Sequence, residues 1–301
     1  MKNFISAILL SLLLLPSAFS VSWMDKVEHG FADNNGVKLH YAKAGSGPLV
    51  VFIHGFPDFW YSWKHQMEGL SSEYTVVAMD TRGYNKSDKP EGGKHYAMPN
   101  LVEDVAAVIR AEKSESAIVV GHDWGGMIAW SFAMAHPEMT EKLIIVNLPH
   151  PKGLINELAT NPDQQKNSAY ARNFQKPDSH KMLNANMFAS MVSRGDEELK
   201  GYYLTAFENS SFDAMMNYYR QNYPKEPYDK ESTDFAPIKM PVLQFHGLND
   251  SALLPGGLND TWNNLEKDFT LVTIPGVGHW SHHEAADMVT DTMKWWLAMR
   301  K

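Results

Sequence analysis

Short, uninterrupted apolar runs recur through the first half of the chain and again near its end. A strand buried on both faces of a parallel sheet reads as such a continuous run rather than as an alternation of apolar and polar residues. An alternating stretch at 37–43 predicts one half-buried strand near the start. The continuous runs predict buried strands at 49–53, 74–79, 117–120, 143–146 and 241–245, and a further strand is expected at 269–274.

Apolar residues at helical spacing separate these runs. They predict helices at about 60–70, 101–111, 127–136 and 285–299. Strands that alternate with helices predict an α/β fold, in which helices cover both faces of a mostly parallel sheet. Ligands of such a sheet bind at the carboxyl ends of its strands.

The alternation stops between residues 151 and 236, where no buried-strand run occurs and the composition is rich in Met, Asn, Tyr and Phe. This break predicts a helical cap at 151–236, inserted into a core that is made of residues 21–150 and 237–301. A cap at this point of the chain would cover the carboxyl ends of the strands and any ligand bound there.

The first twenty residues have a different pattern from the rest. Lys2 precedes an apolar run at 4–15, Pro16 ends the run, and Ala18-Phe19-Ser20 offers a small-residue cleavage site. These three parts predict a signal peptide over residues 1–20 and an exported protein, periplasmic or secreted, whose mature chain has no membrane span. A retained anchor is the alternative, although the run is short for a bilayer.

Composition narrows the function further. With 301 residues and 44% hydrophobic content the chain can form one large α/β domain with an insertion. The formal charge of −8 provides no basic face for a nucleic-acid partner. The absence of cysteine excludes disulfides and thiol chemistry. The number of subunits is left open.

One reactive side chain stands between glycines where a buried strand meets a helix. The run at 117–120 leads into Gly121-His122-Asp123-Trp124-Gly125, and a helical pattern follows. A strand, a sharp turn and a helix around a glycine-flanked residue form a nucleophile elbow, which exposes the middle residue at the top of the sheet. The middle residue here is Asp123, a carboxylate instead of the usual serine.

Two more titratable residues follow later strands. Asp250 comes after the strand at 241–245, and His279 stands in the glycine-rich loop after the strand at 269–274. Taken alone, such an aspartate is usually a turn residue and such a histidine is usually solvated. The order nucleophile, acid, histidine is nevertheless that of the α/β-hydrolase triad. We therefore predict that His279, oriented by Asp250, acts as the base for Asp123.

A second loop completes the predicted site. His54-Gly55-Phe56-Pro57 follows the strand at 49–53, where this architecture supplies one backbone N–H of the oxyanion hole. The other N–H comes from the residue after the nucleophile, so the backbones of Phe56 and Trp124 are the predicted donors. Their side chains and Pro57 are expected to line the substrate pocket. We interpret His54 and His122 as structural.

A carboxylate nucleophile restricts the chemistry. Attack of Asp123 on an ester would give a mixed anhydride, whereas attack on a saturated carbon that bears a leaving group gives an alkyl ester. Water activated by His279 can then hydrolyse that ester, and no cofactor or metal is required. Epoxides and alkyl halides are the natural substrates. An epoxide oxygen needs a proton donor such as tyrosine, while a halide needs N–H donors.

The motifs resemble those of the soluble epoxide hydrolases of the α/β-hydrolase superfamily, over nearly all of the mature chain. The resemblance rests on the elbow, the loop at 54–57, the late His279 and the stretch Asp80-Thr81-Arg82-Gly83-Tyr84. It implies an α/β-hydrolase fold and a small apolar epoxide substrate that reacts with water. We interpret Asp80 and Arg82 as a structural turn.

The resemblance also implies two proton donors in the cap. In that family one tyrosine precedes a Phe-Gln-x-Pro stretch, which matches Tyr170, and another stands in an Asn-aromatic-Tyr-Arg stretch, which matches Tyr219. Both hydroxyls would bind and protonate the epoxide oxygen. Tyr218, Tyr202 and Tyr203 remain alternatives, since aromatic stripes also serve packing.

Three other functions compete with this interpretation. Haloalkane dehalogenases share the elbow, but they usually carry Asn, a halide donor, where this chain has Phe56. Fluoroacetate dehalogenases bind their carboxylate through arginines where this chain has Trp124 and Met127. A catalytically inactive ligand-binding protein is the third alternative, and the complete triad argues against it.

Overall fold

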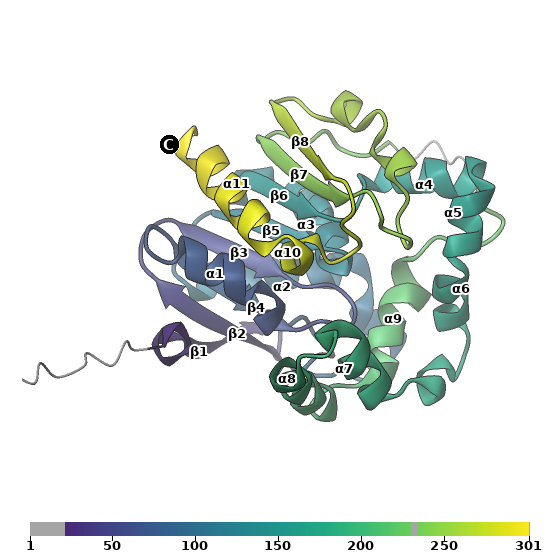
Figure 1. Cartoon of the computed structure of the whole chain (residues 1–301), viewed down its shortest axis with the longest axis horizontal. Coiled ribbons are helices and arrows are strands. Elements are labelled where there is room, and N and C mark those ends of the chain that lie inside the picture. The colour runs from purple at the N-terminus through teal and green to yellow at the C-terminus, as the bar shows by residue number, and fades with distance from the viewer. Residues whose placement is uncertain (1–21, 230–233, 301) are drawn as a thin grey trace, which may run out of the picture.

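The computed structural model describes residues 22–229 and 234–300, and a central eight-stranded sheet dominates it (Figure 1). The strand order is β1-β2-β4-β3-β5-β6-β7-β8; β1 and β2 run antiparallel to their neighbours and all other pairs are parallel. The strands are β1 (Glu28–Asn34), β2 (Val37–Gly45), β3 (Leu49–Ile53), β4 (Thr75–Met79), β5 (Ala117–His122), β6 (Thr140–Val146), β7 (Val242–Gly247) and β8 (Phe269–Ile274).

Helices cover both faces of this sheet. The short helix α1 (Lys64–Leu70) packs against α11 (Ala286–Ala298) in front of the sheet as drawn, with α10 (Ser281–Glu284) beside them (Figure 1). Behind the sheet α2 (Met98–Ala111) packs against α3 (Trp124–Ala135). Because β3 and β5 are covered on both sides, every residue of these strands is buried, as their apolar runs predict.

The predicted strands are all present, and one further strand was missed. In β1 only Ala32 is buried. Because the strand has so little buried surface, its sequence lacks the apolar alternation by which a strand is recognised. Pairing with β2 defines this edge strand instead. The helix expected at 60–70 is divided into a 3-10 turn, η2 (Trp60–Trp63), and α1.

Between β6 and β7 the described residues form helices, turns and loops, with one isolated bridge at Ile238 and no strand. These inserted helices are α4 (Pro151–Thr160), α5 (Pro162–Asn167), α6 (Ala169–Gln175), α7 (Ala185–Ser193), α8 (Glu197–Glu208) and α9 (Phe212–Asn222), with the 3-10 turn η5 (Ser179–Met182). They lie along one edge of the molecule in Figure 1. The cap boundaries at 151 and 236 stay a prediction.

Five other 3-10 turns connect these elements: η1 (Trp23–Lys26), η3 (Gly93–Tyr96), η4 (Pro137–Met139), η6 (Pro255–Leu258) and η7 (Thr261–Asn264). Among the described residues, no helix has both the length and the apolar character that crossing a bilayer requires. The predicted signal peptide, residues 1–20, lies outside the described residues.

Candidate active site

Asp123 stands in a strained turn between β5 and α3. Its φ of 50° and ψ of −121° lie outside the regions that residues with a Cβ normally adopt. The turn is tight, because a side chain at Gly125 would meet the carbonyl oxygen of Ile53, and one at Gly121 would meet the backbone of Gly125. The flanking glycines are thus needed for close packing, and the turn directs the carboxylate of Asp123 out of the sheet.

His279 joins the two aspartates predicted for the triad. Its Nε2 lies 3.4 Å from Oδ2 of Asp123, and its Nδ1 donates a 2.8 Å hydrogen bond to Oδ2 of Asp250. Asp250 follows β7 and His279 follows β8, so the parallel strands bring both to one edge of the sheet beside Asp123. The structure therefore assembles the three residues, which lie 127 and 29 positions apart, in the order of a nucleophile, an acid and a base.

Asp250 is itself held in place by backbone and side-chain donors. Its Oδ1 accepts hydrogen bonds from the backbone N–H groups of Ala252 and Leu253, at 2.8 and 3.0 Å. Its Oδ2 accepts a further bond of 2.9 Å from the side chain of Asn147, at the end of β6. The sequence analysis missed Asn147, although a polar residue directly after a buried strand was a usable signal.

The loop after β3 contacts the nucleophile. The backbone N–H of Phe56 donates a 2.8 Å hydrogen bond to Oδ1 of Asp123. Trp124, the second predicted donor, is the first residue of α3, where backbone N–H groups have no partner within the helix. The Phe56 N–H thus contacts the carboxylate of Asp123, while the role of both N–H groups as oxyanion donors stays a prediction.

An apolar cavity of about 260 Å³ opens above Asp123. Phe56, Pro57, Tyr170 and Tyr219 line it, as predicted, and Trp124 instead borders an adjoining space of about 20 Å³. The rest of the larger lining is Phe174, Phe188, Met191, Ala252, His279 and Trp280. The ring centroids of Tyr170 and Tyr219 are 6.2 Å apart, so α6 and α9 place two hydroxyl-bearing rings beside each other at the cavity.

Known proteins share this architecture. A family model described as the alpha/beta hydrolase fold matches residues 48–286. Epoxide hydrolase 1 of Caenorhabditis elegans is 36% identical to this chain, over 86% of it and 67% of that protein. The AB hydrolase superfamily protein YfhM of Bacillus subtilis is 35% identical, over 88% of this chain and 96% of its own. A solved Bacillus megaterium epoxide hydrolase with an inhibitor has a TM-score of 0.82 and 32% identity, and covers 90% of this chain and 100% of its own.

The chain belongs to the epoxide hydrolases of the α/β-hydrolase superfamily. This membership confirms the predicted fold class and the prediction that the protein is a hydrolase.

Neighbouring charges and hydrogen bonds keep Asp123 ionised in this protein. Burial alone would raise the pKa of Asp123, but the hydrogen bond and charge of His279 outweigh burial and hold that pKa below its ordinary value. Burial likewise opposes a charge on His279, yet Asp250 and Asp123 raise its pKa well above the ordinary value. Asp123 is therefore ionised and paired with a charged imidazole.

The two cavity tyrosines remain protonated. Burial is the largest effect on both, and it raises the pKa of Tyr170 and of Tyr219 well above 10. The charge of Asp123 acts in the same direction on each hydroxyl. Both side chains can consequently donate a hydrogen bond or a proton to a ligand oxygen in the cavity.

The alternative tyrosines have other partners. The hydroxyl of Tyr218 donates to the backbone oxygen of Arg82 at 2.8 Å, and that of Tyr203 donates to Oδ1 of Asp58 at 2.6 Å. Tyr202 is 39% exposed and stacks on Tyr61. None of the three lines the cavity as the described residues form it.

The residues interpreted as structural form hydrogen bonds with backbone groups and buried ion pairs with other side chains. His54 Nε2 accepts a hydrogen bond from the backbone N–H of Thr81. Asp80 accepts bonds from His40, Asn85 and the backbone of Trp60. Arg82 forms a two-pronged, buried ion pair with Asp104.

The sequence analysis also overlooked Asp58, a buried carboxyl next to the site. It accepts hydrogen bonds from Tyr203 of α8 and from the indole N–H of Trp280, the neighbour of His279. Burial raises the pKa of Asp58 to about 7, although these two donors oppose that rise. Asp58 thus joins an inserted helix to the loop that carries the predicted base.

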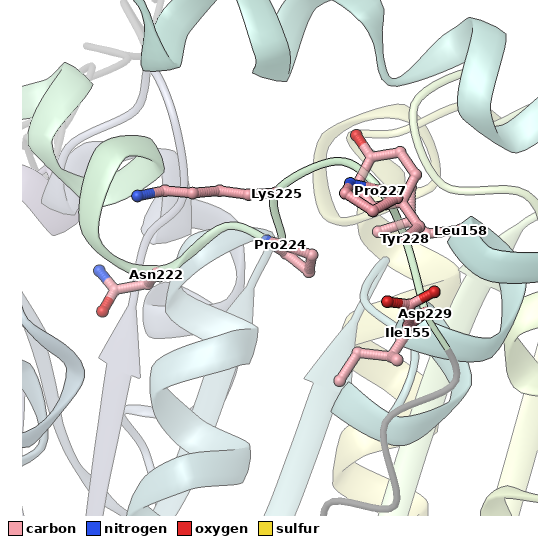
Figure 2. Close-up of a pocket in the computed structure, with 8 residues that line it drawn as sticks. All are labelled: Ile155, Leu158, Asn222, Pro224, Lys225, Pro227, Tyr228 and Asp229. Carbon is pink, nitrogen blue, oxygen red and sulfur yellow. The ribbon is translucent and has the colours of Figure 1, made fainter.

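Another cavity, of about 190 Å³, lies between α4 and the chain after α9 (Figure 2). Both charged and apolar side chains line it: Ile155, Leu158, Asn222, Pro224, Lys225, Pro227, Tyr228 and Asp229. It shares no lining residue with the cavity at Asp123. We therefore place the candidate active site at Asp123.

Proposed function

We propose that this enzyme, a hydrolase acting on ether bonds, opens small apolar epoxides to vicinal diols through a covalent ester on Asp123. The observation that carries the proposal is an ionised carboxylate that faces two protonated tyrosines across an apolar cavity. The printed names of its relatives, among them Epoxide hydrolase 1 of Caenorhabditis elegans, support the same chemistry.

In the first step, a carboxylate oxygen of Asp123 attacks a carbon of the epoxide ring. The bond from that carbon to the ring oxygen breaks, and the oxygen takes a proton from Tyr170 or Tyr219. The product is a hydroxyalkyl ester of Asp123. The cavity favours this attack because its apolar walls exclude water and hold the epoxide between the nucleophile and the donors.

In the second step, water hydrolyses the ester. Ester formation removes the charge of Asp123, and the charged imidazole of His279 first gives its proton to the ionised tyrosine. The neutral imidazole then takes a proton from the water, and Asp250 holds the ring so that Nε2 points toward Asp123. The water oxygen adds to the ester carbonyl, where the backbone N–H groups of Phe56 and Trp124 would stabilise the oxyanion. The bond from the carbonyl carbon to the alkyl oxygen breaks, the diol leaves with the proton of the added hydroxyl, and the Asp123 carboxylate is regenerated beside the charged His279.

A single turnover in ¹⁸O-water with excess enzyme tests this sequence of steps. The first diol is expected to contain unlabelled oxygen from Asp123, and the carboxylate of Asp123 is expected to acquire the label. A His279→Gln variant should accumulate the ester, which mass spectrometry detects as a substrate adduct on the peptide that contains Asp123. An Asp123→Ala variant serves as the control and should form no adduct.

Two results would contradict the proposal. Label in the first diol would show direct attack by water on the epoxide. Halide release from alkyl halides, with no diol from a panel of small aryl and alkyl epoxides, would make the enzyme a dehalogenase.

A further inference from the structure

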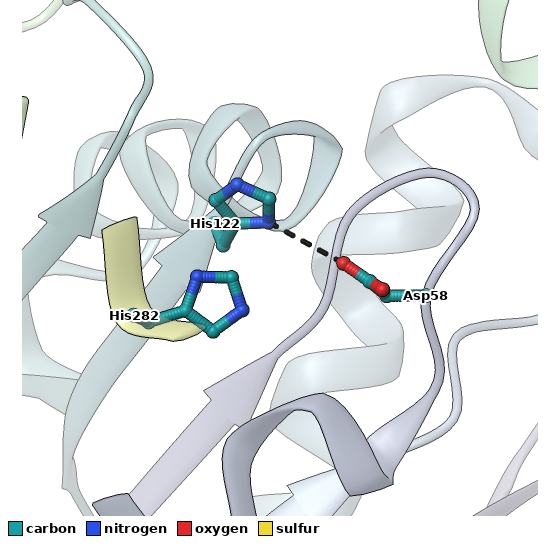
Figure 3. Close-up of side chains that lie close together, drawn as sticks. All are labelled: Asp58, His122 and His282. Atoms are coloured by element: carbon teal, nitrogen blue, oxygen red, sulfur yellow. Dashed lines mark ion pairs between the residues drawn. The ribbon is translucent and has the colours of Figure 1, made fainter. Parts of the chain in front are cut away.

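Three buried side chains converge behind the catalytic histidine. Asp58, His122 and His282 come from the loop after β3, the end of β5 and the short helix α10 (Figure 3). Each is at most 1% exposed. One ligand atom from each lies within 4.8 Å of the other two. The reaction proposed above uses none of the three.

Asp58 and His122 face each other without a hydrogen bond between them. His122 Nε2 lies 2.9 Å from the carbonyl oxygen of His279, which can only accept, so this nitrogen carries the hydrogen. Burial lowers the pKa of His122 to about 3 and keeps the ring neutral. Its Nδ1 therefore presents a lone pair, and this lone pair faces Oδ2 of Asp58 at 3.7 Å. With a neutral ring the contact is not an ion pair, and 3.7 Å is too long for a hydrogen bond, so Nδ1 of His122 has no hydrogen-bond partner among the described residues.

His282 adds a third lone pair to this cluster. Neither of its ring nitrogens has a hydrogen-bond partner among the described residues. Burial lowers its pKa well below the ordinary value, so the ring is neutral and one nitrogen is free to act as a ligand. Its ring centroid is 4.3 Å from that of His122. An unpartnered polar group this deeply buried destabilises the fold, and a ligand would relieve that cost.

We propose that Asp58, His122 and His282 form a binding site for a borderline divalent metal ion such as Zn²⁺. Neutral imidazoles and one carboxylate are the nitrogen and oxygen ligands that such ions prefer. At bond lengths of about 2.0–2.2 Å the ligand atoms would stand about 3.3 Å apart, so the side chains must close by up to about 1.5 Å. Asp58 can coordinate the ion and still accept from Tyr203 and Trp280, since a carboxylate has about four lone-pair positions.

The surface offers a route toward this site. A groove of about 200 Å³ is lined by His65, Trp280 and His283, among others, and His283 is the neighbour of His282 in α10. An ion in this groove would lie beside α10, the helix that carries His282.

Metal binding should also slow the reaction. Closure of the ligands draws Asp58 toward His122, and Asp58 lies two residues after Phe56, whose backbone N–H contacts Asp123. A shift of this loop would misplace the predicted oxyanion donor. This inhibition rests on the proposed function, whereas metal binding itself does not.

Isothermal titration of the full chain with zinc chloride, prepared without a histidine tag, tests the binding. One equivalent of Zn²⁺ is expected to bind. His282→Gln should weaken this binding on the order of 100-fold or more, because even partners outside the metal's own ligands are worth about 10- to 100-fold. His136→Gln is the matched control: it removes a histidine that pairs with Glu103 at the surface, and it should bind as the wild type does.

A second measurement guards against a folding defect in the variant. Zn²⁺ should raise the melting temperature of the wild type and of His136→Gln, but not that of His282→Gln or Asp58→Asn. The proposal is overturned if no equivalent binds, as when Asp58 and His122 share only a proton or a water, or if all variants bind alike. Diol formation is assayed separately. If zinc binds without slowing diol formation, the inferred inhibition is wrong and the metal site stands. If the metal-free enzyme forms no diol, that result contradicts the proposed function and leaves the metal site untouched.

Discussion

At the residue scale, the chemistry depends on which side chains face each other across the cavity. Asp123 is kept ionised by His279, while burial keeps Tyr170 and Tyr219 protonated. The same low-polarity surroundings therefore favour a charged nucleophile and neutral acids, because only the nucleophile has a cationic partner. This difference in protonation suits the opening of an ether ring, which needs an anion and a proton donor together.

Removal of either tyrosine hydroxyl should slow ester formation. For Tyr219→Phe or Tyr170→Phe we expect a loss of about 100-fold in the alkylation rate, since general acids contribute ~10²–10⁴-fold and one tyrosine remains. Hydrolysis of the ester should change little. Stopped-flow tryptophan fluorescence with excess enzyme separates the two steps. Tyr202→Phe, which changes an exposed hydroxyl outside the cavity, should behave as the wild type; equal losses in all three variants would contradict the assignment.

The raised tyrosine pKa values predict a flat alkaline limb for ester formation. A tyrosine donates only while protonated, and a folded-state pKa above the ordinary value moves the loss of that proton to higher pH. The alkylation rate should therefore stay constant from about pH 8 to about pH 10, where an ordinary tyrosine would be half ionised. Single-turnover rates across this range provide the measurement, and a midpoint near the ordinary tyrosine pKa would disprove the prediction.

At the scale of the elements, the ends of neighbouring strands position the triad. Asn147 at the end of β6 donates to Asp250 after β7, and also to the backbone of Gly278 before the base. One side chain thus fixes the acid and the loop of the histidine together. Its φ of 46° shows that the chain turns sharply where the strand ends, a conformation that asparagine tolerates better than most residues.

Asn147→Gly should uncouple this arrangement without straining the backbone, because glycine adopts a positive φ readily. Loss of a hydrogen bond to a charged group costs about 1.5–3 kcal/mol, so ester hydrolysis should slow by about 10- to 100-fold. Asn35→Gly is the matched control, since Asn35 also has a positive φ, in an exposed turn between β1 and β2. The rate of decay of the covalent ester is the measurement. A variant that hydrolyses the ester at the wild-type rate would exclude this positioning role.

At the scale of the whole molecule, polar contacts join the inserted helices to the α/β core. Tyr203 of α8 donates to Asp58, and Tyr218 of α9 donates to the backbone of Arg82. Arg194, just after α7, pairs with Glu284 of α10 at 2.6 Å. Residues of the core and of the inserted helices both line the cavity, so contacts that join these two parts also restrain the spacing of the cavity walls.

Tyr203→Phe should weaken the contact between α8 and the core, because it removes the hydrogen bond to Asp58. The variant leaves the buried Asp58 with one donor fewer, which costs about 1–3 kcal/mol of unfolding free energy. We expect a higher KM with a smaller change in kcat, because the cavity wall moves while Asp123 and His279 keep their partners. Urea unfolding and steady-state diol formation measure the two effects, with Tyr202→Phe as the control. A fall in kcat at unchanged KM would instead place Tyr203 in the chemistry.

Sequence patterns predicted the interior of this fold better than its edges. The residues of β3, in the interior of the sheet, were predicted to the residue because its apolar run is bounded by polar or turn residues. β1 escaped detection because an exposed edge strand is defined by its pairing with β2 rather than by its own composition. The sequence analysis did not identify the positioning residues Asn147 and Asp58 for a related reason: a single polar residue forms no periodic pattern.

The sequence by itself determined the α/β architecture and predicted the nucleophile and the order of the triad, because each is encoded in local spacing or in uninterrupted apolar runs. Only the tertiary structure decided which tyrosines face Asp123. Tyr218 and Tyr219 are adjacent in α9, yet one contacts Arg82 and the other lines the cavity, because successive residues of a helix point in different directions. It also decided protonation, since burial and the neighbouring charges that set each pKa arise only when distant strands and helices meet.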